Sequence, residues 1–258
     1  MENTFLSKLN IEHFLNVNLQ EVLVLKETES TNNLAKELAL QGINSAIVVS
    51  ESQTKGRGRL NREFYSPKNK GIYLSVLLRP NIELKNASKI TAFCGVCVAK
   101  AIESLANVKV GIKWVNDLFI NGKKVGGILT ESAINGETRS LDYVVIGIGV
   151  NVFDDEYPDF IKDIATNIEK ESGAIVNKNE LIAKIVNNLF DVENAVSNNS
   201  FLKEYKQRQI ILNKQIKVVS LNDEFYGVAI DIDENGNLIV NNNGTVQTIS
   251  AGDVSIRI

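Results

Sequence analysis

The dipeptide Asn121-Gly122 constrains the fold more than any other feature of the sequence. It separates two apolar runs, at residues 118–120 and 124–131, whose composition is typical of β-strands. A type I′ turn needs positive φ angles at both central residues, and Asn-Gly is a pair that favours this geometry. We therefore predict a hairpin here and a sheet that is at least partly antiparallel.

Further strand and helix patterns alternate along the first 211 residues. Runs rich in Val, Ile, Tyr and Leu predict strands at residues 46–51, 72–79, 109–114, 118–120, 124–131 and 142–151. Helices are expected at residues 32–41, 86–106 and 178–196; Ser30-Thr31 precede the first and Gly42 closes it. The pattern predicts an α+β domain over residues 1–211, with a mixed, mostly antiparallel sheet and flanking helices.

The character of the sequence changes after Leu212. Five short alternating segments follow, and Asn/Asp/Gly turns such as Asn235-Gly236 and Asn243-Gly244 separate them. The segments lie at residues 215–220, 225–232, 237–241, 245–250 and 254–258. Short strands at this spacing predict a small β-barrel. We expect residues 212–258 to rest on the first domain, because so short a piece has little core of its own.

Composition excludes several classes of protein. The chain has 258 residues and a net charge of -3, and it contains no run of about 18 apolar residues that would span a membrane. Its first 20 residues lack the basic and apolar regions of a secretory signal, so a cytoplasmic location is expected. One histidine and two cysteines cannot build a four-ligand zinc site by themselves. Cys94 and Cys97 share the apolar stripe of a predicted helix, which indicates core packing and not a redox pair.

A loop that interleaves glycines with cations follows the first predicted strand. Gly56 and Gly58 let the backbone bend and approach a ligand closely. Arg57, Arg59 and Arg62 offer planar forks that match phosphate or carboxylate oxygens two at a time. The segment is predicted to wrap an anion, and the alternative interpretation is a solvated surface turn.

A second segment strengthens the functional interpretation. Residues 113–117 read Lys-Trp-Val-Asn-Asp, and residues 124–129 read Lys-Val-Gly-Gly-Ile-Leu. With the loop at residues 56–62 and the following Ser66-Pro67, these motifs make the chain resemble the biotin protein ligases, in the class without an N-terminal helix-turn-helix domain. Asn61 replaces the family's third loop glycine, Val115 its proline, and Phe64 an aromatic residue that is tryptophan in some members. None of these departures removes a charged or hydrogen-bonding side chain.

The resemblance implies a fold and a reaction. These ligases have a catalytic domain similar to class II synthetases and end in an SH3-like domain. They join biotin to ATP, giving biotinyl-5′-AMP and pyrophosphate, and then pass biotin to a lysine of a biotin carboxyl carrier protein, with Mg²⁺ as cofactor. Cations must offset the repulsion between a carboxylate and a polyphosphate, and the resemblance assigns this catalytic work to Lys124, Arg57 and Arg59.

The resemblance also assigns binding residues. The predicted biotin contacts are Ser30, Thr31, Asn32, Gln53, Gly56, Arg57, Gly58, Arg59, Lys124 and Gly127. The predicted ATP contacts are Arg59, Arg62, Lys113, Trp114, Asn116, Asp117 and Asn151, with Asp117 as the Mg²⁺ partner. Hydroxyl and amide groups at residues 30–32 suit a ureido ring, although simple helix capping also explains Ser30 and Thr31. Trp114 has core packing as its alternative.

Residues 147–151 read Gly-Ile-Gly-Val-Asn and superficially suggest a dinucleotide-binding fingerprint. Val152 occupies the place of the third glycine, so that interpretation fails. By resemblance the segment closes the nucleotide pocket, with Asn151 near adenine or ribose. A plain pair of sheet glycines is the alternative.

Two other functions remain open at this point. A lipoate protein ligase would use the same adenylation but needs an apolar dithiolane pocket, whereas Ser30, Thr31, Asn32 and Gln53 favour a ureido ring. A nucleic-acid-binding module would use the arginine loop and the barrel, but a pI near 5.4 disfavours it. The Ser-Thr-Asn motif also begins too early for a repressor domain to precede it, so DNA binding is not expected. An exposed strand edge beside the loop would allow a homodimer.

Overall fold

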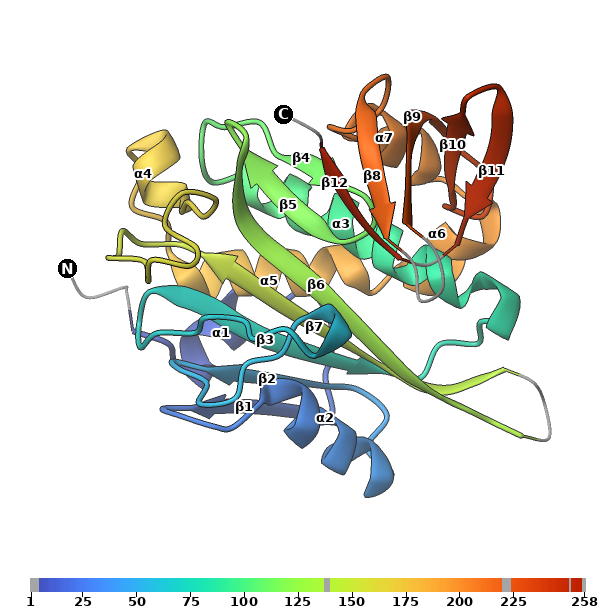
Figure 1. Cartoon of the computed structure of the whole chain (residues 1–258). Coiled ribbons are helices and arrows are strands. Elements are labelled where there is room, and N and C mark those ends of the chain that lie inside the picture. The colour runs from blue at the N-terminus through green and yellow to red at the C-terminus, as the bar shows by residue number, and fades with distance from the viewer. Residues whose placement is uncertain (1–4, 137–139, 220–223, 251, 257–258) are drawn as a thin grey trace.

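A seven-stranded sheet organises the larger part of the molecule (Figure 1). The computed structural model describes residues 5–136, 140–219, 224–250 and 252–256. The strands are β1 (Glu21–Leu25), β2 (Ala46–Ser50), β3 (Gly71–Leu78), β4 (Gly111–Lys113), β5 (Asp117–Ile120), β6 (Lys123–Ile134) and β7 (Leu141–Asn151), in the order β1-β2-β3-β7-β6-β5-β4. Among the neighbouring strands of this sheet, as far as the structure describes the chain, only β1 and β2 are parallel, so the predicted mixed, mostly antiparallel sheet is confirmed.

The Asn121-Gly122 turn joins β5 to β6 as the sequence predicts. Their φ angles are 49° and 80°, both in the left-handed region that a type I′ turn requires. The hairpin register sets Asp117 opposite Gly127. This turn therefore fixes which residues of β5 and β6 lie side by side at the centre of the molecule.

Helices cover the two faces of the sheet unequally. The helices are α1 (Lys8–Phe14), α2 (Thr31–Leu40), α3 (Ala87–Glu103), α4 (Ile168–Ser172), α5 (Lys178–Leu189), α6 (Val192–Asn198) and α7 (Leu202–Gln207), with short 3₁₀ turns at Arg59–Asn61 and Leu84–Asn86. The main core lies on the face covered by α1, α3 and α5. On the opposite face α2 packs over β2, β3 and β7 in a smaller apolar cluster.

Strand alternation separates the residues of these two faces. On β7, Ile146 and Ile148 enter the main core, while Val145 joins the cluster under α2. Because successive side chains point to opposite faces of a sheet, Gly147 and Gly149 lie on the α2 side. The same alternation places Ser75 of β3 on that face. The α2 face beyond the helix is therefore lined by small and polar residues.

The predicted helix at residues 178–196 is wrong in its continuity. The chain breaks at Phe190 and Asp191, which separate α5 from α6. Leu189 before the break and Val192 after it are both buried, at 0% and 2% exposure. The change of direction lets both apolar stripes reach the core, and sequence periodicity alone does not detect it. Cys94 and Cys97 are free and buried, and burial raises the pKa of both thiols, as expected for core residues.

A second, five-stranded antiparallel sheet follows and has contacts with α3 and α7 (Figure 1). Its strands are β8 (Gln215–Val219), β9 (Glu224–Ile232), β10 (Leu238–Asn242), β11 (Thr245–Ile249) and β12 (Asp253–Ile256), in the order β11-β10-β9-β8-β12. The predicted strand ends at Ser220 and Ile258 lie outside the described residues. The indole Nε1 of Trp114 donates to the Gly236 carbonyl at 3.0 Å, so the larger sheet and this one are in direct contact.

None of the described helices is a candidate for a membrane span. Within the described ranges, no helix combines the length and the apolar composition needed to cross a bilayer.

Candidate functional site

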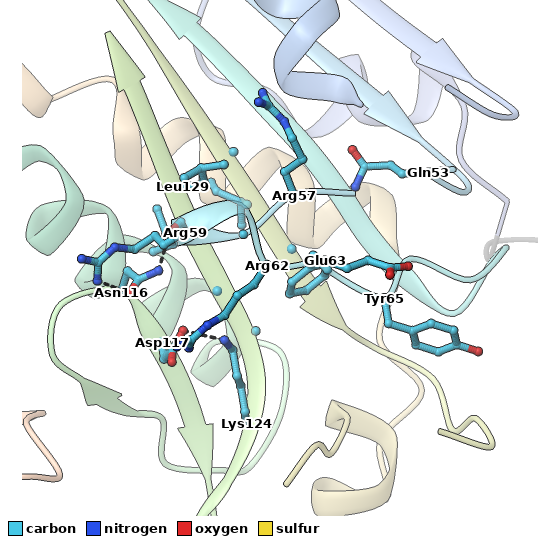
Figure 2. A pocket seen from close by; sticks show the side chains of 18 of the residues that line it. Gln53, Arg57, Arg59, Arg62, Glu63, Tyr65, Asn116, Asp117, Lys124 and Leu129 are labelled. Atoms are coloured by element: carbon cyan, nitrogen blue, oxygen red, sulfur yellow. Dashed lines mark hydrogen bonds and ion pairs between the residues drawn. The ribbon is translucent and has the colours of Figure 1, made fainter. Parts of the chain in front are cut away.

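A cavity of about 270 Å³ opens on the α2 face of the sheet (Figure 2). The start of α2, the loop after β2 and strands β3, β5, β6 and β7 enclose it, and residues 157–165 complete its wall. The predicted site residues in its lining are Ser30, Thr31, Asn32, Gln53, Arg57, Gly58, Arg59, Arg62, Asn116, Asp117, Lys124, Gly127 and Asn151. Residues from five separated parts of the sequence thus meet around one space.

One end of the cavity is polar but uncharged. Ser30, Thr31 and Asn32 lie at the start of α2 and are only 3%, 3% and 4% exposed. Ser30 occupies the N-cap position, yet its side chain makes no capping hydrogen bond. Capping therefore does not account for a buried hydroxyl at this place, and Ser30 lines the cavity instead.

Gln53 is held in one orientation beside these residues. Its Oε1 accepts from the Thr31 backbone N–H at 2.9 Å and from the Thr31 hydroxyl at 3.1 Å. Its Nε2 donates to the Ser66 hydroxyl at 3.1 Å, and that hydroxyl donates to the Phe64 carbonyl at 2.8 Å. This series of hydrogen bonds begins at a backbone donor, the Thr31 N–H, and ends at a backbone acceptor, the Phe64 carbonyl. The uncharged end of the cavity is therefore ordered without a ligand.

Two glycines of β7 make room for this arrangement. A Cβ at Gly147 would lie 2.3 Å from Asn32 Oδ1, and one at Gly149 would lie 2.4 Å from the Phe64 ring. Real Cβ contacts are never this close, so both positions need glycine for close approach. Gly147 therefore makes room for Asn32 of α2, and Gly149 makes room for the Phe64 ring. The two glycines are thus not a plain pair of sheet glycines.

The other end of the cavity carries the cations. Lys124 of β6 and Asp117 of β5 form an ion pair with Nζ and Oδ1 2.6 Å apart, across the hairpin that Asn121-Gly122 closes. Asn116 is fixed beside them, since its Nδ2 donates to the Ile128 carbonyl at 2.7 Å. Asn151 at the end of β7 donates to the Thr166 carbonyl at 2.9 Å.

The arginine loop spans both ends. Arg59 donates to Asn116 Oδ1 at 3.2 Å and to the Gly252 carbonyl at 2.7 Å, so it contacts both sheets. Figure 2 shows Arg57 directed away from Lys124 and Asp117. Its Nη2 donates to Asn33 Oδ1 at 2.8 Å and lies 3.3 Å from the Glu131 carboxylate. Arg62 lies near Asp117 in the same view.

Three predicted residues lie beside the described lining and not in it. Gly56 is enclosed by backbone and side chains, since a Cβ there would lie 2.4 Å from the Phe64 carbonyl. Lys113 ends β4. Trp114 is 3% exposed and directs its indole N–H to Gly236. The geometry indicates that Gly56 supports the loop and that Trp114 matches the core alternative, whereas the ATP contact of Lys113 stays a prediction.

Several residues of the site are missing from the sequence-based prediction. The Ser75 hydroxyl of β3 lies 2.6 Å from Asn32 Oδ1 and 2.8 Å from Thr31 Oγ1, and Glu131 of β6 accepts from Asn32 Nδ2 at 2.7 Å. Tyr157, Ile161 and Ile164 line the wall. A polar residue inside an otherwise apolar strand was the available signal for Ser75, and it is a weak one.

Glu131 is ionised in this setting. Burial raises its pKa, but hydrogen bonds from Lys36 and Asn32 and the charges of Lys36 and Arg57 outweigh burial and lower it. Its carboxylate therefore keeps a negative charge beside the uncharged end of the cavity at neutral pH.

Asp117, the predicted Mg²⁺ partner, lines the cavity. Among the residues that the structure describes, no group of three or more His, Cys, Asp or Glu side chains is arranged to hold a metal ion. Mg²⁺ commonly uses one or two carboxylates together with substrate phosphates and water. Asp117 in the cavity fits that role only when phosphates supply the remaining oxygens.

Comparisons with known proteins agree with this geometry. Residues 24–151 match the Biotin/lipoate A/B protein ligase family, and residues 211–257 match the Biotin protein ligase C terminal domain. The Bifunctional ligase/repressor BirA of Bacillus subtilis is 33% identical over 239 residues, which cover 90% of this chain and 72% of the relative. The chain belongs to the biotin protein ligase family. It is accordingly a ligase, and its second sheet is the family's C-terminal domain.

Further relatives match most of this chain. The Biotin--[acetyl-CoA-carboxylase] ligase of Mycobacterium tuberculosis is 28% identical over 90% of this chain and 87% of its own length. The biotin protein ligase from Aquifex aeolicus in complex with biotin and ATP superposes with a TM-score of 0.78 at 26% identity, covering 93% of this chain and 99% of that one. The family and the α+β fold predicted from the motifs are thereby confirmed.

Proposed function

We propose that this biotin protein ligase forms biotinyl-5′-AMP from biotin and ATP and then transfers biotin to a lysine of a biotin carboxyl carrier protein. One observation carries the proposal: a single cavity of about 270 Å³ joins an uncharged, hydrogen-bonding end to an end with the cationic side chains of Lys124, Arg59 and Arg62. A biotin molecule has the same polarity, with a neutral ureido ring and a carboxylate. The Aquifex aeolicus relative was crystallised with biotin and ATP, which supports both substrates.

The uncharged end would hold the ureido ring. Thr31 and Gln53 offer oxygen acceptors and amide donors, which a neutral ring needs and a charged side chain does not supply. Because the hydrogen bonds among these groups exist before binding, the ligand loses little energy in ordering them. The valeryl chain would then run toward Lys124.

The cationic end would carry the first chemical step. A carboxylate oxygen of biotin attacks the α-phosphorus of ATP, a P–O bond forms, and the bond to the pyrophosphate leaving group breaks. Lys124, with Arg57, Arg59 and Arg62, would offset the repulsion between the anions and stabilise the charge on the transferring phosphoryl group. Mg²⁺ at Asp117 would neutralise phosphate charge when ATP brings it.

The second step needs access for an amine and exclusion of water. The lysine amine of the carrier attacks the acyl carbon of the mixed anhydride, AMP leaves with the bonding electrons, and the amine loses a proton. A loop with glycines at positions 56 and 58 can close over the adenylate and keep water from hydrolysing it. We expect residues 55–62 to resist protease once biotin and ATP are both present, and equal cleavage with and without ligands would contradict loop closure.

Pyrophosphate exchange tests the proposed function directly. Purified protein is incubated with ATP, labelled pyrophosphate and either biotin or lipoate, and label in ATP is measured. Exchange with biotin alone supports the proposal, whereas exchange with lipoate alone transfers the chain to the lipoate branch of the matched family. Exchange with neither acid would overturn the adenylating function.

Four further assignments stay predictions. They are the carrier protein as acceptor, the cytoplasmic location, the homodimer and the lack of DNA binding. The net charge of -3 disfavours a nucleic-acid contact, because such affinity depends on neutralising phosphates. Fluorescence anisotropy with labelled duplex DNA at low salt would test the last prediction, and sedimentation would test the homodimer.

A further inference from the structure

Glu131 holds three side chains at the border of the cavity without belonging to its described lining. Its Oε2 accepts from Asn32 Nδ2 at 2.7 Å, and its Oε1 lies 2.9 Å from Lys36 Nζ. Arg57 reaches both oxygens with a single nitrogen, at 3.3 and 3.4 Å. Charge-assisted bonds are usually near 2.7–2.9 Å. Asn32 and Lys36 are thus held firmly, and Arg57 loosely.

The carboxylate fixes the direction of the Asn32 amide. An ionised carboxylate only accepts hydrogen bonds, so Asn32 must turn its Nδ2 toward Glu131. The Leu129 carbonyl, also only an acceptor, adds a longer contact to Nδ2 at 3.4 Å. Asn32 Oδ1 therefore faces the other way, toward Ser75.

Ser75 passes this direction on to Thr31. Its hydroxyl has one proton and two oxygens within reach, Asn32 Oδ1 at 2.6 Å and Thr31 Oγ1 at 2.8 Å. Since Asn32 Oδ1 is the nearer oxygen and only accepts, it takes the proton. Thr31 in turn shares its own proton between Ser75 Oγ at 2.8 Å and Gln53 Oε1 at 3.1 Å. The lone pairs of Thr31 Oγ1 are left to accept a hydrogen bond from the cavity.

We propose that Glu131 is a positioning residue that sets the ligand specificity of the uncharged end. By fixing the direction of the chain from Asn32 through Ser75 to Thr31, it makes Thr31 an acceptor for a ring N–H of the substrate. The inference rests on the proposed function and names how the site recognises the ureido ring. Glu131 acts through Asn32 and does not contact the ligand.

Glu131→Gln would remove the fixed orientation of the Asn32 amide. Its side chain both donates and accepts, so Asn32 can turn and present Nδ2 to Ser75. The Ser75 proton would then point to Thr31 and occupy one of the two lone pairs with which Thr31 accepts a donor of the ligand. Burial of all three groups makes the effect large, because water does not replace the lost partner.

The experiment measures selectivity by calorimetry with the full chain. The ligands are biotin and two analogues in which one or the other ureido N–H is replaced by oxygen. For the wild type, at least one analogue should bind about tenfold or more weakly, the effect expected of one lost hydrogen bond at a buried acceptor. For Glu131→Gln we expect this ratio of dissociation constants to fall to about twofold.

The ratio of the dissociation constants distinguishes a positioning role of Glu131 from a general weakening of ligand binding. Loss of the Glu131 charge also changes Arg57 and Lys36, but that weakens biotin and its analogues equally. Glu37→Gln makes the same chemical change at an exposed position of α2 and should keep the wild-type ratio. A Glu131→Gln protein that keeps the wild-type ratio would overturn the inference, whatever its absolute affinity.

The variant Ser75→Ala tests the inference if Glu131→Gln does not fold. Ser75→Ala breaks the relay between Asn32 and Thr31, so it should also lower the ratio, and adding Glu131→Gln to it should change the ratio no further. Independent, additive effects of the two substitutions would overturn the relay. A wild-type protein that fails to bind biotin would instead overturn the proposed function, and the inference with it.

Discussion

The two ends of the cavity differ in how their polar groups are held. At the uncharged end, Ser30, Thr31 and Asn32 are almost fully buried, and Thr31 and Asn32 are bonded to other fixed groups. At the cationic end, the side chain of Lys124 remains 34% exposed and forms an ion pair with the Asp117 carboxylate. The first end is ready for a ligand, whereas the second must exchange its partners when a phosphate arrives. Ligand recognition thus needs side chains that are already held in place, whereas the chemical step needs side chains that can change partners.

Removing a cation should have the largest effect. Lys124→Ala deletes the ammonium group that lies 2.6 Å from Asp117 Oδ1 and so removes this ion pair. Adenylation measured by pyrophosphate exchange should fall by about a hundredfold or more, because one positioned charge-stabilising group is lost. Lys123→Ala, at the neighbouring residue of β6, is the matched control and should exchange nearly as the wild type. Unchanged exchange in a folded Lys124→Ala protein would remove this residue from the mechanism.

Gly147→Ala and Gly149→Ala test whether the two ends of the cavity are equally rigid. Gly147→Ala pushes a methyl group against Asn32, which Glu131 and Ser75 hold in place, whereas Gly149→Ala pushes one against the half-buried Phe64 ring of the loop. Overpacking of a fixed side chain costs about 1–3 kcal/mol. Urea unfolding should show the larger loss for Gly147→Ala, and calorimetry should show the weaker biotin binding. Equal losses would mean that the two ends are equally rigid.

Deleting one hydroxyl should have a smaller effect, limited to binding. Thr31→Val keeps the shape of the side chain and removes the group that bonds to Gln53. Biotin affinity should fall by about tenfold, in line with one hydrogen bond at a buried site. The KM for ATP should not change, since the cationic end is untouched. A rise in both constants would show that the ends are coupled.

Acid should remove a small part of the stability through Glu131. Its pKa is lowered in the folded protein, so its contribution is present above the unfolded value near 4.5 and is lost as pH falls through the folded pKa. The partners are partly exposed, which limits the contribution to about 1 kcal/mol. The difference in unfolding free energy between wild type and Glu131→Gln should shrink from pH 7 to pH 3. A constant difference would exclude ionisation as its cause.

Much of the fold follows from local patterns, and the missing parts depend on distant pairing. The hairpin at Asn121-Gly122 and the strands on either side of it are predicted because turn chemistry and alternation are local properties. Strand β1 is a five-residue edge strand whose parallel partner lies more than twenty residues later, and no local pattern predicts it. Parallel pairing leaves no turn signal to read.

The site divides in the same way. Charged and glycine residues of the loop stand out in the sequence, so the lining at Arg57, Arg59 and Lys124 is predicted. Ser75 and Glu131 fall in segments whose patterns are satisfied by a plain strand. Only the register of β3, β7 and β6 brings them to the α2 face, level with Asn32. Their role depends on which face a strand presents and on what crosses it, and neither follows from the segment alone.

The contact between Trp114 and Gly236 gives the protein a built-in optical reporter. The chain has one tryptophan, and its indole is buried where the two sheets meet. Indole emission shifts to longer wavelength when water reaches the ring. Any separation of the C-terminal sheet from the larger one would therefore change the colour of the protein's own fluorescence, with no dye attached. Stopped-flow emission during mixing with biotin and ATP would time that movement against the chemical step.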